Sequence, residues 1–510
     1  MKIKLYGYVL LLLFSAACKD LDTINPNNPD RKTVLRSSAD LAPVLRGAYL
    51  AWWQGVHNDH PVIALSIGAD AYSMSWGNFG AQRFGEEPRS AYNNRSNEDP
   101  DYKQVAEAPW FGCLSAVSSA NDVLAALQRG VSLDQGGPQD QSMKAAAHML
   151  RGLSWGYLGL LFDQALIAKE ETDVEREIPF STYQEMIIVA ESELDTAIKL
   201  AQLAGGDFVH NYFNGVTLGA NGFIRLCHAY AARFLAQAAR TAEENDSAPW
   251  QRILAHTEQG IQENFAPLAD GRFWSSYHKY VFAETGQGPF WARVDQRLIA
   301  ALDPSQPSRY PAVFAQGETP LANPRATSAD ARLASDFVFL PMNNFPIERG
   351  EWHFSHYKHN RNKTDPSFAG DGSSNGPMPT FRVADNELLR AEALLRLRRK
   401  AEAVAIINAG TRLSRGNLLP LSASAPDATV LRAIWYERAI ELLSTAPMGL
   451  WLDRRRAGPR LDYRQLDDLG GLQIGTPAQL PVPADEMRIR MQEPYNFGGP
   501  KDPNGIVRTF

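Results

Sequence analysis

Residues 148–166, HMLRGLSWGYLGLLFDQAL, allow two different folds. They contain Gly152-Leu-Ser154-Trp-Gly156, the G-x-S-x-G pattern of the nucleophile elbow in serine hydrolases. An elbow requires a strand that ends in a sharp turn and opens a helix. The residues before it, 141–150, are rich in Ala and Met and contain no β-branched residue, so no strand is predicted there.

The same stretch carries the pattern of an amphipathic helix. Its apolar residues recur at the spacing of one helix face, at Ala146, Met149, Leu150, Leu153, Tyr157, Leu160 and Leu161. Three glycines, 152, 156 and 159, fall on a neighbouring stripe, although each costs up to about 1 kcal/mol against Ala inside a helix. We therefore expect another helix to approach this stripe closely. Ser154 is predicted to be an ordinary helix residue and not a nucleophile.

Helical patterns of this kind continue along most of the chain. They cover residues 38–53, 108–128, 141–166, 182–204, 220–244, 249–264, 382–398, 400–414 and 426–443. Several are joined by short connections, and residues 391–407, AEALLRLRRKAEAVAII, resemble the helix–turn–helix of a tetratricopeptide unit. Such pairs stack into one core. The sequence predicts a mainly α fold, with helical repeats over about 38–264 and 382–443.

Two long segments, 55–109 and 265–380, break the helical pattern and are rich in Pro, Gly, Asn and aromatic residues. Irregular segments of this length are usually functional or disordered. Their aromatic content argues against disorder. We interpret them as ligand-binding loops carried on the helical scaffold.

The N-terminus has the pattern of an export signal. Lys2 and Lys4 precede an apolar run, residues 5–14, which is too short to span a bilayer of about 30 Å and fits a cleaved signal peptide. Small residues then lead to Cys18, which resembles a bacterial lipobox, although Ser15 stands where Leu is usual. We predict a lipoprotein signal peptide at 1–17, a lipidated Cys18 with a flexible tether at 18–37, and one domain at 38–510. The alternative is an ordinary signal peptide with an incidental cysteine.

Composition excludes several classes of protein. The 51 Lys and Arg nearly balance 57 Asp and Glu, so neither a nucleic-acid groove nor a polyacidic ligand is implied. Cys113 and Cys227 lie in apolar helical contexts and are predicted to be buried free thiols. No later run of 18 apolar residues occurs, so no membrane span is predicted in the mature chain.

Other patterns that suggest chemistry are incomplete. Residues 371–376 begin like an EF-hand calcium loop, but Arg382 occupies the position of the bidentate Glu. His353, His356 and His359 lie among cationic residues, and we expect a polar, partly exposed strand or loop there. Ser276 and Lys279 match S-x-x-K without the other motifs of that enzyme class. No cofactor, no metal and no catalytic residue is predicted.

Seven stretches, taken in order, resemble the SusD/RagB family of outer-membrane nutrient-binding lipoproteins. The paired helices 147–167 and 181–201, and the next pair, 220–239 and 249–261, resemble its central repeats. Residues 381–413 are similar to its late repeat, WYERAIELLSTAPMGLWLDRRRAG (435–458) to its C-terminal signature, and LPVPADEM (480–487) to its closing motif. Residues 442–451 depart from the family's more charged pattern, which leaves the subfamily open.

The resemblance implies a SusD-like fold and a function in nutrient uptake. The family's members capture oligosaccharide, or in some cases peptide, at the cell surface and deliver it to a SusC-like TonB-dependent transporter. The resemblance therefore implies a lipid-anchored protein at the outer-membrane surface that takes part in polysaccharide utilization. Lys19-Asp20-Leu21-Asp22 also resembles an acidic signal for surface export. Two alternatives stay open: an all-α glycoside hydrolase, with acid candidates at Glu86, Glu87, Glu98, Asp99 and Asp101, and a periplasmic helical-repeat scaffold.

Candidate ligand-binding residues lie in both irregular segments. A sugar ring presents a face of C–H groups on which an indole or phenol can stack, while amide and guanidinium groups hydrogen-bond the hydroxyls. Residues of these types in polar, flexible settings are Trp76, Asn78, Phe79, Trp274, Tyr277, Trp291 and Arg293. We expect Trp76 and Trp274 to provide the stacking faces, and Asn78 and Arg293 to be their polar partners.

Overall fold

The structure is a computed structural model. It describes residues 35–74, 76–95, 100–173, 175–276, 278–279, 281, 292–307, 325–341, 354–361, 375–462 and 470–510. Helices dominate these residues, and each strand is only two or three residues long. The fold is mainly α, as predicted from the helical periodicity. Cys18, like the predicted signal peptide at 1–17, lies outside the described residues.

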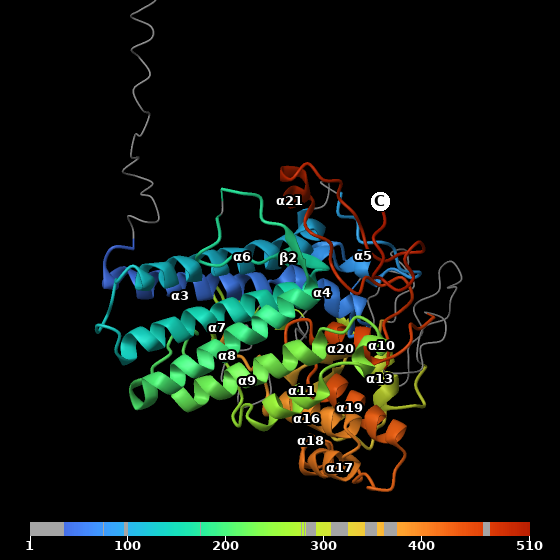
Figure 1. Ribbon diagram of the computed structural model, residues 1–510. Coiled ribbons are helices and arrows are strands. Elements are labelled where there is room, and N and C mark those ends of the chain that lie inside the picture. The colour runs from blue at the N-terminus through green and yellow to red at the C-terminus, as the bar shows by residue number, and fades with distance from the viewer. Residues whose placement is uncertain are drawn as a thin grey trace, which may run out of the picture.

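Five long helices form the first part of the scaffold: α3 (Ser38–Val56), α6 (Pro100–Gln128), α7 (Pro138–Leu161), α8 (Tyr183–Ala204) and α9 (Ala220–Gln237). Each helix packs on the next one in this order, and the contact between α7 and α8 is the most extensive. Figure 1 shows these helices lying side by side. They contribute most of the large hydrophobic core.

The glycine stripe of α7 is the reason why its neighbours can lie so close. A methyl group on Gly152 would lie 2.8 Å from Leu194 Cγ of α8, and one on Gly159 would lie 3.0 Å from Met186 Cβ. Gly156 faces the ring of Phe234 on α9. Ser154 lies in the interior of α7 and is completely buried. The prediction that this stretch is a packing helix, and not a nucleophile elbow, is confirmed.

A second group of helices continues the stack toward the bottom of Figure 1: α11 (Trp250–Glu258), α16 (Val383–Arg396), α17 (Lys400–Ala409), α18 (Thr411–Ser414) and α19 (Asp427–Glu441). The short helix α10 (Ala242–Asp246) lies between α9 and α11 in the chain. α11 packs on α9 and α16, and α16 packs on α17 and α19. The predicted helix–turn–helix at 391–407 is therefore confirmed as α16 and α17.

The arginines of α20 (Gly449–Ala457) join the two groups of helices. Arg455 donates hydrogen bonds to the Leu160 carbonyl of α7 at 2.6 Å and the Gln237 carbonyl of α9 at 2.7 Å. Arg456 pairs with Glu392 of α16 at 3.1 Å. These bonds satisfy carbonyl groups at helix C-termini that have no partner within their own helix. The arginine run in the C-terminal signature thus has a structural role.

The segment 55–109 is less irregular than predicted. It contains α4 (Asp59–Gly68), η1 (Asn78–Gly80), α5 (Ala81–Gly85) and the first turns of α6. α4 is apolar on all sides and seven of its ten residues are buried, so it has no amphipathic period to detect. Pro109, which the sequence suggested as a boundary, lies inside α6.

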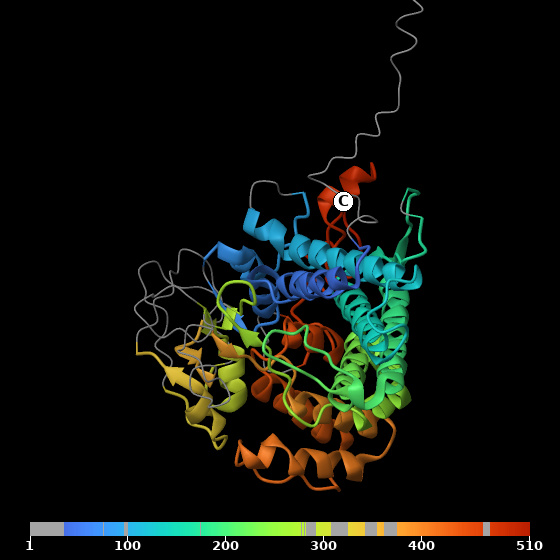
Figure 2. The same cartoon turned by 90° about the vertical axis from the view of Figure 1, so that its left-hand side faces the viewer.

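The insertions are organised around a second hydrophobic core. Two short antiparallel pairs contribute to it: β1 (Tyr72–Ser73) with β5 (Arg293–Val294), and β6 (Phe337–Phe339) with β7 (Tyr357–His359). A third pair, β4 (Leu268–Ala269) with β8 (Gly376–Pro377), lies apart from this core. The helices α13 (Gln296–Leu302) and α14 (Arg332–Asp336) belong to this part. Figure 2 shows it on the opposite side of the molecule from α8 and α9.

The remaining short elements lie in the connections between the scaffold helices and near the C-terminus. β2 (Gln164–Leu166) and β3 (Phe180–Thr182) pair antiparallel between α7 and α8, η2 (Gly205–Asp207) follows α8, and α21 (Ala484–Ile489) lies near the C-terminus. Cys113 and Cys227 are buried free thiols, as predicted. Within the described residues, Tyr102–Gln128 is long and apolar enough to cross a membrane, but it packs between α3 and α7 as a core helix.

Candidate functional site

The two insertions meet at a short sheet. Tyr72 pairs with Val294, and Ser73 pairs with Arg293, in the antiparallel register of β1 and β5. Ser73 Oγ donates a 2.8 Å hydrogen bond to Asp295 Oδ2, and the Asp295 N–H donates to the Ala71 carbonyl. This pairing places the segment that leads to Trp76 beside the one that follows Trp291.

Trp76, Asn78 and Phe79 lie on a tight turn directly after β1. The turn is fixed by hydrogen bonds from Gln82 N–H to the Trp76 carbonyl and from Gly80 N–H to the Gly77 carbonyl, both at 3.0 Å. Trp76 and Phe79 are half-buried against the second core, while Asn78 is exposed. The turn therefore holds two aromatic rings at the surface with an amide between them.

Phe79 has the conformation of a constrained residue. Its φ of 61° lies in the left-handed region, which residues with a side chain rarely adopt. The ring of His60 meets the Phe79 ring edge-on, with centroids 5.3 Å apart. Backbone strain of this kind persists only where the surroundings impose it, so the position of the Phe79 ring is strongly determined.

The first turn of α4 also anchors the other insertion. Asp59 Oδ1 accepts a 2.8 Å hydrogen bond from the His278 N–H. His60, the next residue, contacts Phe79. The backbone directly after Tyr277 is thus attached to the helix that supports the aromatic turn. The side chains of Tyr277 and Trp291 themselves lie outside the described residues.

Two of the predicted ligand-binding residues, Trp274 and Arg293, are buried. Trp274 is only 7% exposed and packs at a tilt on Trp53 of α3, with ring centroids 4.9 Å apart. Arg293 is 3% exposed, and its guanidinium lies 5.5 Å from the Phe354 ring centroid. Neither offers a face to solvent, so their predicted roles as stacking face and polar partner are wrong for this structure. A polar sequence context did not reveal that Trp274 packs into the large scaffold core, or that Arg293 lies on a buried strand.

The aromatic side chain that the sequence argument missed is Phe273. It is 46% exposed, and the Arg272 guanidinium lies 4.6 Å from its ring centroid. Asp270 Oδ1 accepts hydrogen bonds from three successive N–H groups of this turn, and Gln54 of α3 donates to the Phe273 carbonyl. The polar sequence around this turn does not show that Trp274 is buried and that Phe273 is exposed.

The acid candidates include Glu87. Burial raises the pKa of its carboxyl to about 8, which Arg89 opposes. Gln473 Nε2 donates to both Glu87 and Asp70, and Asp70 pairs with Arg89 at 2.6 Å. This carboxyl belongs to a closed network of charged groups. Glu98, Asp99 and the side chain of Asp101 lie outside the described residues.

The structure describes part of the histidine cluster and of the segment that begins like a calcium loop. His356 and His359 lie in and beside β7, as a strand was expected, but they are 3% and 1% exposed, so the expectation of partial exposure is wrong. His353 and residues 371–374 lie outside the described residues. No group of three or more His, Cys, Asp and Glu side chains among those described is placed to hold a metal ion.

Comparison with known proteins identifies solved structures that share this fold. A model described as the SusD family matches residues 344–446, and comparison with curated proteins finds no match. A SusD superfamily protein from Bacteroides thetaiotaomicron is similar over 89% of this chain and 98% of its own, with 15% identity and a TM-score of 0.58.

Two further solved structures are similar to this chain. A SusD-like carbohydrate binding protein from Bacteroides vulgatus has 15% identity and a TM-score of 0.56, over 84% of this chain and 87% of its own. A structure determined with xylogluco-oligosaccharide has 12% identity and a TM-score of 0.51, over 81% and 82%. Together, these likenesses show that the chain has the fold of SusD superfamily proteins, and the SusD family model matches its residues 344–446.

Proposed function

We propose that this protein is a lipid-anchored glycan-binding protein of the outer-membrane surface, which captures oligosaccharide and passes it to a SusC-like TonB-dependent transporter. The observation that carries the proposal is the turn with Trp76, Asn78 and Phe79, held where the two insertions meet. Half-buried aromatic rings beside an exposed amide suit a sugar, which needs a stacking face and hydrogen-bond donors for orientation. A SusD-like carbohydrate binding protein and a structure determined with xylogluco-oligosaccharide, both similar in fold to this chain, support the same proposal.

Binding is tested by titrating the purified protein with a panel of neutral and acidic oligosaccharides in a calorimeter. We expect saturable binding of at least one glycan, with no product formed on prolonged incubation. Cleavage of the bound glycan would favour the hydrolase alternative. If the protein bound peptides but no glycan, the turn would still be the proposed binding site, but its ligand would be a peptide.

Anchoring is a separate prediction, because it depends on Cys18 alone. Cys18→Ala removes the thiol that a lipobox would present for acylation, so this variant should leave the membrane fraction or accumulate unprocessed. The measurement is membrane fractionation of cells in which the wild-type chain is compared with Cys18→Ala. Unchanged fractionation would contradict lipidation, and insensitivity of the intact chain to protease added outside the cells would contradict surface exposure.

The transporter is tested by co-purification. A tagged wild-type chain extracted in mild detergent should bring with it a TonB-dependent transporter encoded beside it. If no β-barrel transporter is retained under conditions that preserve glycan binding, the delivery step is wrong while the capture step stands.

A further inference from the structure

The corner between α3 and α4 contacts the second insertion and the large core. His57, which follows α3, is 3% exposed and stacks on Trp53, with ring centroids 3.7 Å apart. Trp53 belongs to the large core, packs on Trp274 and donates from Nε1 to the Ser275 carbonyl at 2.9 Å. The corner is therefore fixed on two sides before α4 begins.

Asn58, the N-cap residue of α4, holds two groups of His60. Its side chain accepts a 3.0 Å hydrogen bond from the His60 N–H, and the same Oδ1 atom lies 2.9 Å from His60 Nδ1. Because a carbonyl oxygen can only accept, Nδ1 carries a proton and donates it to this bond. One side-chain atom thus holds both the backbone and the imidazole of His60, which fixes the rotation of the ring.

The His60 ring in turn supports the aromatic turn. It meets the Phe79 ring edge-on, with centroids 5.3 Å apart and an interplanar angle of 69°, which is a preferred arrangement of two rings. The backbone of Phe79 is left-handed, with φ at 61°, and such a conformation persists only where its surroundings impose it. Contact with His60 is therefore part of what keeps the Phe79 ring in place.

The other side of the turn is closed by α6. Gly80 also has a left-handed backbone, with φ at 69°, and a methyl group there would lie 3.0 Å from Tyr102 Cδ2 and 3.4 Å from Val105 Cγ2. The short helix η1 packs on both α4 and α6. Because α6 leaves no room on its side, the turn can shift only where the contact with α4 allows it.

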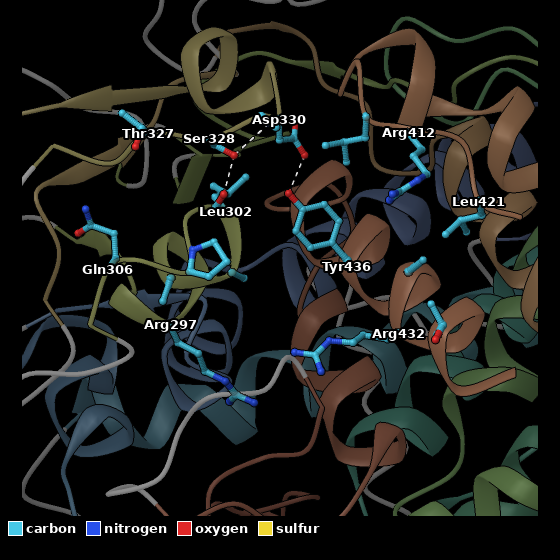
Figure 3. A pocket seen from close by; sticks show the side chains of 17 residues that line it. Arg297, Leu302, Gln306, Thr327, Ser328, Asp330, Arg412, Leu421, Arg432 and Tyr436 are labelled. Atoms are coloured by element: carbon cyan, nitrogen blue, oxygen red, sulfur yellow. Dashed lines mark hydrogen bonds between the residues drawn. The ribbon is translucent and has the colours of Figure 1, made fainter. Parts of the chain in front are cut away.

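The far end of the second insertion is held independently of this corner. On the wall of the cavity in Figure 3, Asp330 accepts a 2.7 Å hydrogen bond from the Tyr436 hydroxyl of α19. Arg332 of α14 pairs with Asp330 and with Glu437 of α19, both at 2.7 Å. A change at the corner should leave these contacts as they are, so this region is an internal reference for the experiments below.

We propose that Asn58 and His60 are positioning residues of the aromatic turn, which hold the Phe79 ring in the orientation that binds glycan. Asn58 acts through His60, and His60 acts through Phe79. The glycan in this statement rests on the proposed function. The order of the three residues rests on their contacts alone.

Hydrogen exchange of the full protein tests the positioning without any ligand. The reporters are the N–H groups of Gly80 and Gln82, which donate to the Gly77 and Trp76 carbonyls. In His60→Ala the peptide that contains them should exchange about fivefold faster or more, which corresponds to about 1 kcal/mol of local stability. Peptides from α14 and α19 should exchange as in the wild type.

Three further variants separate positioning from loss of a helix cap. Asn58→Ala should also speed exchange at the turn, because it releases the His60 ring. Asn58→Asp keeps an oxygen that accepts from both groups and should behave like the wild type. Thr182→Ala removes the cap of α8 and should leave the turn unchanged. Asn58 and His60 are only half-buried, and each variant tests the inference if the other does not fold.

The binding experiment uses cellohexaose, maltohexaose and a xyloglucan heptasaccharide, and continues with the one that binds the wild-type protein tightest. His60→Ala should weaken its binding about tenfold, less than the roughly thirtyfold expected for loss of an aromatic anchor. In a Phe79→Ala background, His60→Ala should have no further effect, because the ring through which it acts is gone. A general loss of stability would add to the effect of Phe79→Ala.

Three results overturn the inference. The first is unchanged exchange at the turn in both Asn58→Ala and His60→Ala. The second is glycan binding that depends on Phe79 but not on His60, and the third is a His60→Ala effect that persists in full in Phe79→Ala, which would make His60 a ligand contact. If the turn loosens as expected but none of the three glycans binds, the positioning is supported and the proposed function is not.

Discussion

At the scale of single residues, Gly156 shows how closely the scaffold is packed. Its Cα faces the Phe234 ring so directly that a methyl group there would overlap the ring. Gly156→Ala should therefore lower the free energy of unfolding by roughly 2 kcal/mol or more, because an overpacked core must shift. Urea unfolding of the purified variant measures this directly.

Two variants serve as controls. Gly47→Ala changes a glycine of α3 that has nothing within 4 Å, so it should stabilise the protein by up to about 1 kcal/mol. Ser154→Ala removes a buried hydroxyl that has no hydrogen-bond partner, and it should be close to neutral. A Gly156→Ala protein as stable as Gly47→Ala would contradict the packing argument, and labelling of Ser154 by a serine-directed probe would revive the hydrolase.

Lys279 gives the protein a pH dependence. Burial, with Arg382 and Arg361 nearby, lowers the pKa of Lys279 from 10.5 to about 7. Between these values the unfolded chain carries a proton that the folded protein has released, so stability rises with pH by up to about 1.4 kcal/mol per unit. The contribution is unfavourable below pH 7, where folding forces a buried amine to stay charged.

The measurement is urea unfolding of wild type and Lys279→Met at pH 7, 8 and 9. The wild-type protein should gain stability relative to the variant over this range. Parallel curves would show that Lys279 is charged in the folded protein. The hydrogen bond from Lys279 Nζ to the Pro379 carbonyl adds only a constant offset between the two proteins.

At the scale of helices, the N-terminal capping box of α8 leads to a prediction about stability. Thr182 accepts a hydrogen bond from Glu185 N–H, while Glu185 Oε2 accepts from the Thr182 N–H at 2.8 Å. Thr182→Ala should cost about 1 kcal/mol of unfolding free energy, since it leaves helix N–H groups without a partner. Thr196→Ala, farther along the same helix, should be neutral or stabilising. Equal stability of the two variants would show that the cap contributes nothing.

The helices that could be predicted are those whose sequence carries a periodic apolar stripe. α7, α8, α9 and the α16–α17 hairpin have one, and their existence follows from it, although the C-terminal halves of α7 and α9 are buried on all sides. α4 could not be found in this way, because its ten residues are mostly apolar and show no such stripe. The predicted helix 220–244 was too long, since α9 ends at Gln237 before the separate α10.

The candidate site could be predicted by segment but not by side chain. Both insertions were singled out from composition, and the structure brings their backbones together at β1 and β5. Which of Phe273 and Trp274 faces solvent depends on the path of one turn around Asp270 and on Trp53, which lies more than 200 residues earlier in the sequence. Such long-range packing leaves no local signal.

At the scale of the whole molecule, the stacked helices provide a rigid frame and the insertions form a second body with its own core. The frame accounts for the family match, which covers the late helical pairs within residues 344–446. The insertions are where relatives of this fold can differ in ligand, because loops tolerate changes that a packed core does not. The proposed cargo therefore depends on a few surface residues of the second body.

The most direct test of glycan capture is calorimetry of Trp76→Ala with the tightest glycan found for the wild-type protein. Loss of an aromatic anchor typically costs about 2 kcal/mol or more, so affinity should fall roughly thirtyfold in a variant that still shows a cooperative thermal transition. Phe111→Ala, which removes an exposed aromatic ring on α6, should bind like the wild type. If folded Trp76→Ala binds the glycan as tightly as the parent, the aromatic turn is not the site of capture.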